Sequence, residues 1–290
     1  MEGARGARTN GTNGTDKANA TILNCEGRTA NRELLTTIVM ADELVRMDRI
    51  NKFFGRVQAL SDVTLSVNRN EIVGLLGDNG AGKSTLIKIL SGALRADSGD
   101  IYMHGNRVKI RNTTDAIALG IETIYQDSAL IAQLSIARNL FLGREPVKGP
   151  RFFDRLDQDK MNQVARDLLK QVGIKKEIPP TTPISALSGG ERQAVAIARA
   201  MHFESELIIL DEPTNNLGVE ETQGVLRFVR GARDSGHSCI LIAHNIYHVF
   251  QVVDRIIVLR RGKTVADDID PKRTTIEAVE SIITGMPLGL

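Results

Sequence analysis

The segment GDNGAGKS, residues 77–84, has the spacing G-x-x-x-x-G-K-[ST] of a phosphate-binding loop. Its glycines allow the backbone to turn N–H groups toward phosphate oxygens with no Cβ in the way. Lys83 can neutralise the β and γ phosphates of a nucleotide, and Ser84 can coordinate Mg²⁺. The loop follows an apolar run, EIVGLLG (71–77), and precedes a helical pattern, KSTLIKILSG (83–92). Because this chemistry requires a strand, a loop and a helix in that order, we predict a nucleotide site here and not a chance glycine-rich turn.

Two carboxylates, Asp211 and Glu212, follow the apolar run LIIL at 207–210. Ligands of open α/β sheets gather at the carboxyl ends of the strands, which is where this pair would lie. Asp211 is suited to hold Mg²⁺ through its water shell, and Glu212 could accept a proton from an attacking water. Alone, the pair could merely cap the next helix. Beside a phosphate loop, we interpret it as part of a catalytic site.

The segment LSGGE, residues 187–191, begins a helical pattern with two adjacent glycines, although each lowers helix stability by roughly 1 kcal/mol relative to alanine. A glycine pair at a helix start leaves the first N–H groups without a Cβ beside them, next to the positive end of the helix dipole. Ser188 can add a hydroxyl. We therefore predict a second anion site. Since 77–84 already cradles the phosphates, we expect two chains, each supplying half of each site.

The overall composition excludes some classes of protein. The chain has 290 residues and is 42% hydrophobic, which provides enough material for a large core. Its 37 basic and 35 acidic residues nearly cancel, so we expect no nucleic-acid partner and no polybasic membrane contact. No apolar stretch approaches the about 18 residues of a membrane span, and no apolar core follows the basic residues of the N-terminus. These features, and cysteines only at positions 25 and 239, favour a cytoplasmic protein.

Hydrophobic periodicity predicts the elements that must position these residues. Residues 1–40 are rich in Gly, Asn and Thr and are expected to be disordered. Alternating strands are predicted at 44–50 and 59–67, buried strands at 71–77, 207–211 and 238–244, and hairpins at 99–110, with its turn at His104–Asn106, and at 255–267. Helices are predicted at 157–172, with Asp157 as N-cap, and at 275–283, closed by Gly285. The order indicates an α/β fold with an antiparallel β portion and a helical insertion.

The motif LSGGE resembles the signature of ABC ATPases, and its place between the phosphate loop and LIILDE is the order found in that family. The resemblance covers about residues 42–285. It implies a single domain at 41–290 with a P-loop NTPase core of mainly parallel sheet. It also implies an antiparallel β subdomain and a helical subdomain at about 127–205.

The resemblance also assigns roles to single residues. Phe54, directly before Gly55, resembles the aromatic residue that stacks on adenine. Gln126 in TIYQD is similar to the Q-loop glutamine that touches Mg²⁺ and water, and His244 in LIAHN resembles the switch histidine at the γ-phosphate. Taken singly, Phe54 could be a core aromatic, Gln126 a surface residue and His244 a partner for a carbonyl.

Together these motifs imply a site for ATP and Mg²⁺. The residues expected to bind nucleotide are Phe54, Gly77, Asn79, Gly80, Gly82, Lys83, Ser84, Thr85, Ser188, Gly189 and Gly190. The catalytic residues are expected to be Glu212, His244, Gln126 and Lys83, and the metal ligands Ser84, Gln126 and Asp211.

The segments LLGDNGAGKSTLIKILSGALRADSGDIYMHG and DEPTNNLG look like the branch of ATP-binding subunits in monosaccharide importers, of the ribose and fructose type. That resemblance implies a homodimer or a paired nucleotide-binding subunit, and an integral membrane permease that contacts residues 127–142. It further implies an indirect solute-binding protein and a place at the inner face of the membrane. One position departs from the family: Gly218 stands where many members have the aspartate of the loop after the catalytic glutamate.

Other classes of protein remain open at this stage. A soluble regulatory ABC ATPase would share all the motifs, although such proteins often carry two nucleotide domains or long coiled coils, which this sequence lacks. A kinase on the same phosphate loop would leave LSGGE unexplained. A nucleotide-sensing module without turnover would not need Glu212 and His244.

Overall fold

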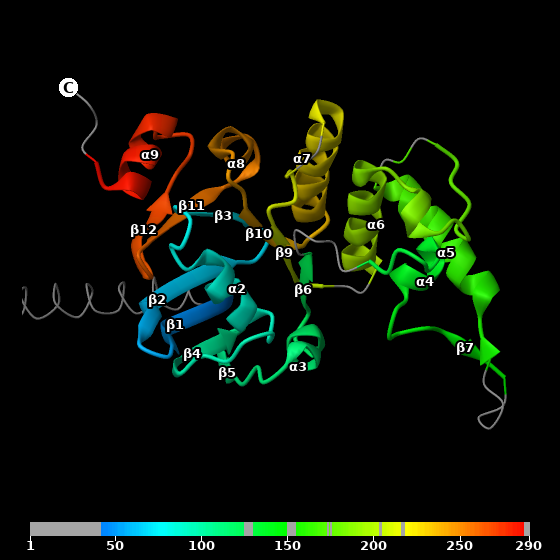
Figure 1. Cartoon of the computed structure of the whole chain (residues 1–290), viewed down its shortest axis with the longest axis horizontal. Coiled ribbons are helices and arrows are strands. Elements are labelled where there is room, and N and C mark those ends of the chain that lie inside the picture. The colour runs from blue at the N-terminus through cyan, green and yellow to red at the C-terminus, as the bar shows by residue number, and fades with distance from the viewer. Residues whose placement is uncertain are drawn as a thin grey trace, which may run out of the picture. The chain divides into compact units, whose positions relative to one another are not determined.

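A six-stranded sheet, in the order β12-β11-β3-β10-β9-β6, carries the phosphate loop, the Asp211–Glu212 pair and His244 at the ends of its strands (Figure 1). Its strands are β3 (Ile72–Leu76), β6 (Ile121–Ile124), β9 (Leu207–Asp211), β10 (Ser238–Ile242), β11 (Arg255–Arg260) and β12 (Lys263–Ile269). All neighbours pair in parallel except β12, which pairs antiparallel to β11. Every residue of β3 and β10 is buried, as their uninterrupted apolar runs predict for strands covered on both faces.

The structure is a computed structural model and describes residues 42–124, 130–149, 155–172, 174, 176–202, 205–215 and 218–286. The predictions for residues 1–40, Cys25 and Gln126 lie outside these ranges. Glu43–Leu290 form one compact unit. Within the described ranges, no helix is long and apolar enough to cross a membrane.

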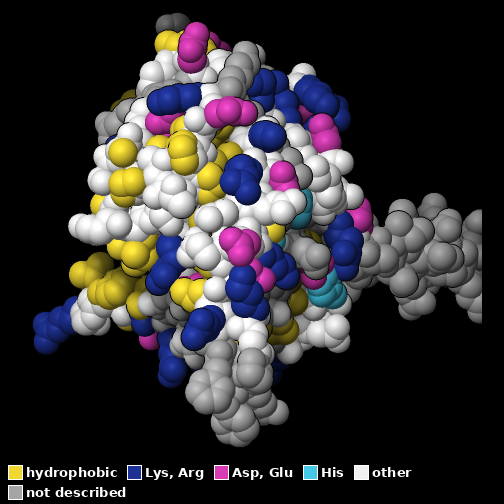
Figure 2. All heavy atoms as spheres, turned by 90° about the vertical axis from the view of Figure 1, so that its right-hand side faces the viewer, with side chains coloured by type: hydrophobic (Ala, Val, Ile, Leu, Met, Phe, Trp, Pro, Cys, Tyr) yellow, Lys and Arg dark blue, Asp and Glu magenta, His cyan; other side chains and the backbone are white. Residues whose placement is uncertain are grey.

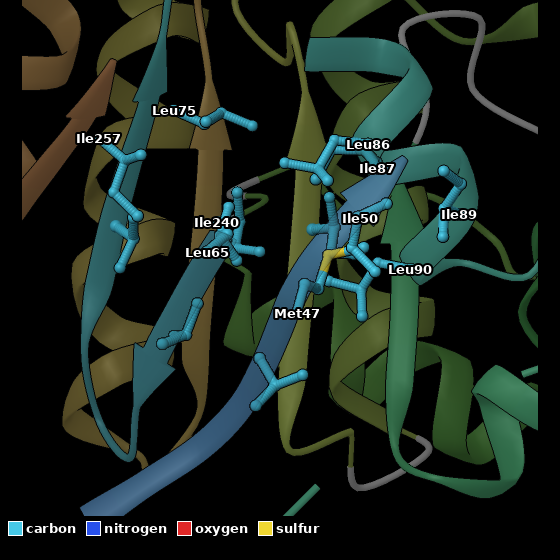
Figure 3. Packing of buried hydrophobic residues seen from close by; sticks show 14 of the residues in the cluster. Met47, Ile50, Leu65, Leu75, Leu86, Ile87, Ile89, Leu90, Ile240 and Ile257 are labelled. Carbon is cyan, nitrogen blue, oxygen red and sulfur yellow. The ribbon is translucent and has the colours of Figure 1, made fainter. Parts of the chain in front are cut away.

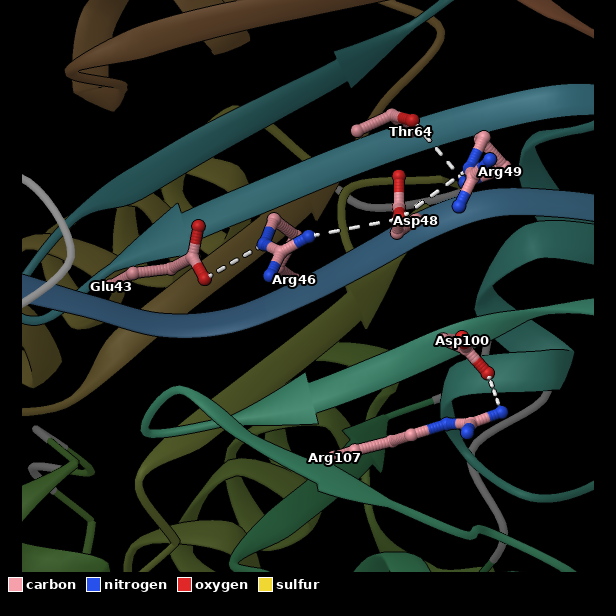
Figure 4. Close-up of polar contacts among 7 residues, drawn as sticks. All are labelled: Glu43, Arg46, Asp48, Arg49, Thr64, Asp100 and Arg107. Atoms are coloured by element: carbon pink, nitrogen blue, oxygen red, sulfur yellow. Dashed lines mark hydrogen bonds and ion pairs between the residues drawn. The ribbon is translucent and has the colours of Figure 1, made fainter. Parts of the chain in front are cut away.

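A second sheet is antiparallel, in the order β2-β1-β4-β5. Its strands are β1 (Glu43–Phe54), β2 (Val57–Asn68), β4 (Ser98–Met103) and β5 (Asn106–Val108). One face carries apolar side chains such as Met47 and Leu65, which join Ile240 and helix α2 (Lys83–Leu90) in one core cluster (Figure 3). The other face is polar: Arg46 Nε lies 3.0 Å from Glu43 Oε1, and Arg107 pairs with Asp100 (Figure 4). This alternation is what the period-2 sequence pattern predicts.

Side chains of β10 alternate between the two faces of the sheet and pack into two different hydrophobic cores. Ile240 and Ile242 face the antiparallel sheet and α2, whereas Cys239 and Leu241 face the helices on the other side. Those helices are α6 (Gly189–His202), α7 (Val219–Asp234), α8 (Ile246–Val252) and α9 (Ile276–Thr284). Burial raises the pKa of the Cys239 thiol to about 12, so this cysteine is a packing residue.

The helical insertion has a third core of its own. Helices α4 (Ile136–Leu140) and α5 (Gln158–Gln171) pack on α6 through side chains such as Leu140, Met161 and Val195. Asp157 caps α5 as predicted, since its carboxylate accepts the Lys160 N–H at 3.2 Å. The remaining short elements are α3 (Thr113–Ala118), the 3-10 turn Ile184–Ala186, and a hairpin of β7 (Val147–Lys148) and β8 (Arg155–Leu156). Basic and acidic side chains are interspersed on the face that carries this insertion (Figure 2).

One turn differs from its prediction. The turn of the first hairpin is His104–Gly105 only, and Asn106 already pairs with Met103. Both turn residues have positive φ, 50° and 75°, as a two-residue type I′ turn requires. Asn106 is therefore the first residue of β5, and the predicted three-residue turn was wrong by one position.

The close approach of Gly92, just after α2, to the backbone of Asn112 can be tested by substitution. Gly92 has φ +74°, and a Cβ there would lie 2.2 Å from the Asn112 carbonyl oxygen. We expect Gly92→Ala to lower the free energy of unfolding by about 2 kcal/mol or more. The matched control is Gly231→Ala in α7, where a Cβ meets nothing within 4 Å. It should raise stability by up to about 1 kcal/mol. Urea unfolding measures both, and equal effects would contradict this account.

Candidate functional site

The phosphate loop connects β3 to α2 and is built on three glycines with positive φ: Gly77 at 150°, Gly80 at 77° and Gly82 at 106°. Gly82 is the N-cap of α2. A Cβ on Gly77 would lie 2.3 Å from the Leu259 carbonyl oxygen, so close packing on β11 requires glycine there. At Gly80 a Cβ would meet nothing within 4 Å, so that position faces open space. The loop therefore has the left-handed backbone and the open side that a phosphate cradle needs.

Lys83 lies across this loop. Its ammonium donates to the carbonyl oxygens of Gly77 at 2.6 Å and Asp78 at 3.0 Å. Burial lowers the pKa of Lys83, while the negative charges of Glu212, Asp78 and Asp211 oppose that shift. Lys83 as a whole is 7% exposed, so its charge is held near the loop, where a phosphate would meet it. Of the other predicted loop residues, Asn79 and Ser84 are exposed and Thr85 is half-buried.

The carboxylates lie at the strand ends, as predicted. Asp211 pairs in register with Ile242 across β9 and β10, and the Glu212 N–H donates to the Ile242 carbonyl at 2.9 Å. Glu212 then takes φ 53°, a left-handed conformation that is uncommon for a residue with a side chain. Its Oε1 lies 2.5 Å from Nε2 of His244, which follows β10. The structure thus brings Lys83, Asp211, Glu212 and His244 to one edge of the sheet.

The donors at this edge fit Mg²⁺ that arrives with a nucleotide. Burial and the charge of Glu212 raise the pKa of Asp211, so this edge holds a carboxylate pair that a divalent cation would stabilise. Asp211 and Ser84 offer oxygen ligands, which Mg²⁺ prefers, and the ion usually takes its other ligands from phosphates and water. Among the described residues, no group of three His, Cys, Asp or Glu side chains could hold a metal without such help.

The signature segment begins α6 with a reciprocal cap. The Glu191 N–H donates to Ser188 Oγ at 3.2 Å, and the Ser188 N–H donates to Glu191 Oε2 at 2.8 Å. The Ser188 carbonyl accepts the first helical hydrogen bond, from Arg192, at 3.0 Å. This is a capping box, which explains how a helix starting with two glycines forms. The sequence prediction missed this role of Glu191, although the spacing S-x-x-E was visible.

The phosphate loop and the signature segment LSGGE (187–191) line two different cavities. Gly77, Asp78, Asn79 and His244 line one of about 710 Å³, together with residues of α8 and α9. Ser188 and Gly190 line another of about 600 Å³ between α6 and α7. Among the residues that the structure describes, none lines both cavities. In the described part of the chain, therefore, the two predicted anion sites lie in separate cavities.

Phe54 lies on the surface at the end of β1. The residue is 51% exposed, which excludes the alternative of a core aromatic. The Lys52 ammonium lies 5.7 Å from the centre of its ring and 2.9 Å from Asp97 Oδ1. Hydrogen bonds from the Phe53 N–H and then from Lys52 lower the pKa of Asp97. An exposed ring with one face near a cation is available to stack on a planar ligand.

Comparison with known proteins agrees with these motifs. The family model described as ABC transporter matches residues 60–215. The chain is 43% identical over 248 residues to the xylose/arabinose import ATP-binding protein of Sulfolobus acidocaldarius. It is 41% identical over 251 residues to the fructose import ATP-binding protein of Rhizobium meliloti. Each match covers 85% of this chain and 96% of the relative.

A solved structure has the same fold. The crystal structure of a nucleotide-free ATP-binding cassette from an ABC transporter superimposes with a TM-score of 0.71 at 23% identity. The match covers 83% of this chain and 95% of that one. The predicted mixture of a mainly parallel core, an antiparallel β part and a helical insertion is therefore confirmed.

The capping box can be tested apart from nucleotide chemistry. We expect Ser188→Ala to lower the free energy of unfolding by about 1 kcal/mol, because the Glu191 N–H loses its acceptor. Glu191→Gln should cost less, because an amide oxygen can accept the same bond from Ser188. Urea unfolding of the two variants measures the difference. A larger loss for Glu191→Gln would mean that the charge of Glu191, and not its hydrogen bond, holds the helix start.

Proposed function

The chain belongs to the ABC transporter family, and on that premise we propose that two copies bind two Mg·ATP head to tail and hydrolyse them. The observation that carries this proposal is the separation of the two anion sites into different cavities of one chain. In the dimer, the phosphate loop of one copy and Ser188–Gly190 of the other would enclose the same triphosphate. Each chain alone offers half of the donors that a triphosphate needs.

In the proposed reaction, a water attacks the γ-phosphorus and passes its proton to Glu212, while the bond from that phosphorus to the β–γ bridging oxygen breaks and ADP leaves. Lys83 and the N–H groups of the partner's signature stabilise the charge that develops on the phosphate oxygens. Mg²⁺, when bound near Ser84, Asp211 and Gln126, supplies further charge neutralisation at the β and γ oxygens. The exposed Phe54 ring would stack on the adenine. His244 would move from Glu212 to the γ-phosphate.

We further propose that hydrolysis drives uptake of a monosaccharide through a membrane permease. The two relatives that this chain covers almost fully are named for import of xylose or arabinose and of fructose. On this proposal the chain is cytoplasmic and attaches to the inner face of the membrane through the permease, which would contact residues 127–142. A solute-binding protein would select the sugar. The likeness to import proteins disfavours a soluble regulatory ATPase.

Substitution of the proposed base gives the test. We expect Glu212→Gln to lower kcat by about 100- to 10,000-fold, because an amide cannot accept the proton. ATP binding should persist, and Mg·ATP should convert the variant from monomer to dimer. Phosphate release and analytical ultracentrifugation measure the two effects.

The matched control is Glu206→Gln. Glu206 lies before β9, at the opposite end of the strand, where it pairs with Arg69 and His104. This variant should hydrolyse ATP at nearly the wild-type rate. Wild-type turnover by Glu212→Gln would show that the base is assigned wrongly.

A further inference from the structure

The two oxygens of the Glu212 carboxylate are held by different donors. His244 Nε2 lies 2.5 Å from Oε1, and Asn215 Nδ2 donates to Oε2. An ionised carboxylate only accepts hydrogen bonds, so the side-chain amide of Asn215 must present its NH₂ group to it. The Glu212 side chain is 14% exposed, so few water molecules compete for these contacts.

Asn215 is tied to Glu212 through the backbone as well. Its N–H donates to the Glu212 carbonyl at 3.2 Å, which closes a turn over residues 212–215. Glu212, the first residue of this turn, has the left-handed φ of 53°. A residue in this conformation keeps its position only when the surrounding structure holds it. Asn215 thus restrains both the backbone and the carboxylate of Glu212.

His244 and Asn215 differ in how easily each side chain could move away from the Glu212 carboxylate. His244 follows β10 and its side chain is 46% exposed, whereas Asn215 is half-buried and shares a turn with Glu212. Movement of His244 toward a phosphate would release Oε1. Oε2 would stay bound to Asn215. The oxygen that faces the attacking water would then be Oε1 alone, in a fixed carboxylate plane.

We propose that Asn215 is a positioning residue for the base: it anchors Oε2 of Glu212 so that Oε1 accepts the proton of the attacking water. This rests on the proposed role of Glu212. It adds that Asn215, the residue after the segment DEPT (211–214), fixes the orientation of the Glu212 carboxylate in the same chain.

The test is Asn215→Leu, which keeps the approximate size of the side chain and removes the donor. We expect kcat for ATP hydrolysis to fall about 10- to 100-fold, since a misplaced base loses alignment with the water. KM for ATP should change less than about 2-fold, because no contact with the bound nucleotide is removed. Asn215→Asp should lose at least as much, because it places a second acceptor against Oε2.

The matched control is Thr214→Val in the same turn. Thr214 Oγ1 lies 3.3 Å from His248 Nδ1, so this variant also loses a side-chain contact, but not one to Glu212. Its kcat should stay within about 2-fold of wild type. Equal losses of kcat in Thr214→Val and Asn215→Leu would reduce Asn215 to a packing role, and unchanged kcat in Asn215→Leu would overturn the proposal outright.

A double variant separates this inference from the proposed function. On the Glu212→Gln background, Asn215→Leu should cause no further loss in a single-turnover assay, since both residues act through one carboxylate. The same 10- to 100-fold loss on both backgrounds would mean that Asn215 acts elsewhere. If Glu212→Gln itself turns over normally, the base is misassigned, and that failure is distinct from a normal rate in Asn215→Leu alone.

Discussion

Parallel pairing of β9, β10 and β3 is the constraint on which the site depends. Leu241 lies opposite Gly74 on one side and Leu210 on the other, so the three strands run side by side and end at one edge. Parallel strands place their carboxyl ends together, and the chain leaves each of them through a loop. The phosphate loop therefore lies near the carboxylates of Asp211 and Glu212 and near His244, although these segments are far apart in the sequence. An apolar core on each face of the sheet holds that pairing.

Bringing these charged groups together costs electrostatic free energy, which their mutual contacts partly offset. Burial disfavours the charged forms of both Lys83 and Asp211, and each is partly compensated by the charge of the other. The Lys83 ammonium also uses two loop carbonyls as acceptors. These contacts hold the Lys83 ammonium beside the phosphate loop. A bound nucleotide phosphate would replace these carbonyls as a stronger acceptor.

Strong local patterns made much of this predictable. The buried strand at 207–211, the Asp157 cap and the closing helix with Gly285 at its end depend on neighbouring residues, and the structure has them there. The pairing of Asn215 with Glu212 could not be predicted, because it depends on a left-handed φ at Glu212 that no propensity favours. The separation of the two predicted anion sites was expected from the sequence, but the cavity between α6 and α7 that Ser188 and Gly190 line could not be, because it depends on how these helices pack.

The central claim is that one ATP site is built from two chains, and mixing two inactive variants tests it most directly. Lys83→Met disables the phosphate loop, and Gly189→Asp places a carboxylate where the signature would meet phosphate. Each variant alone should be inactive. Their equimolar mixture should regain about one quarter of the wild-type ATPase rate, because half of the randomly formed dimers contain one intact site. A mixture that stays inactive although the two variants form dimers with each other would contradict the claim.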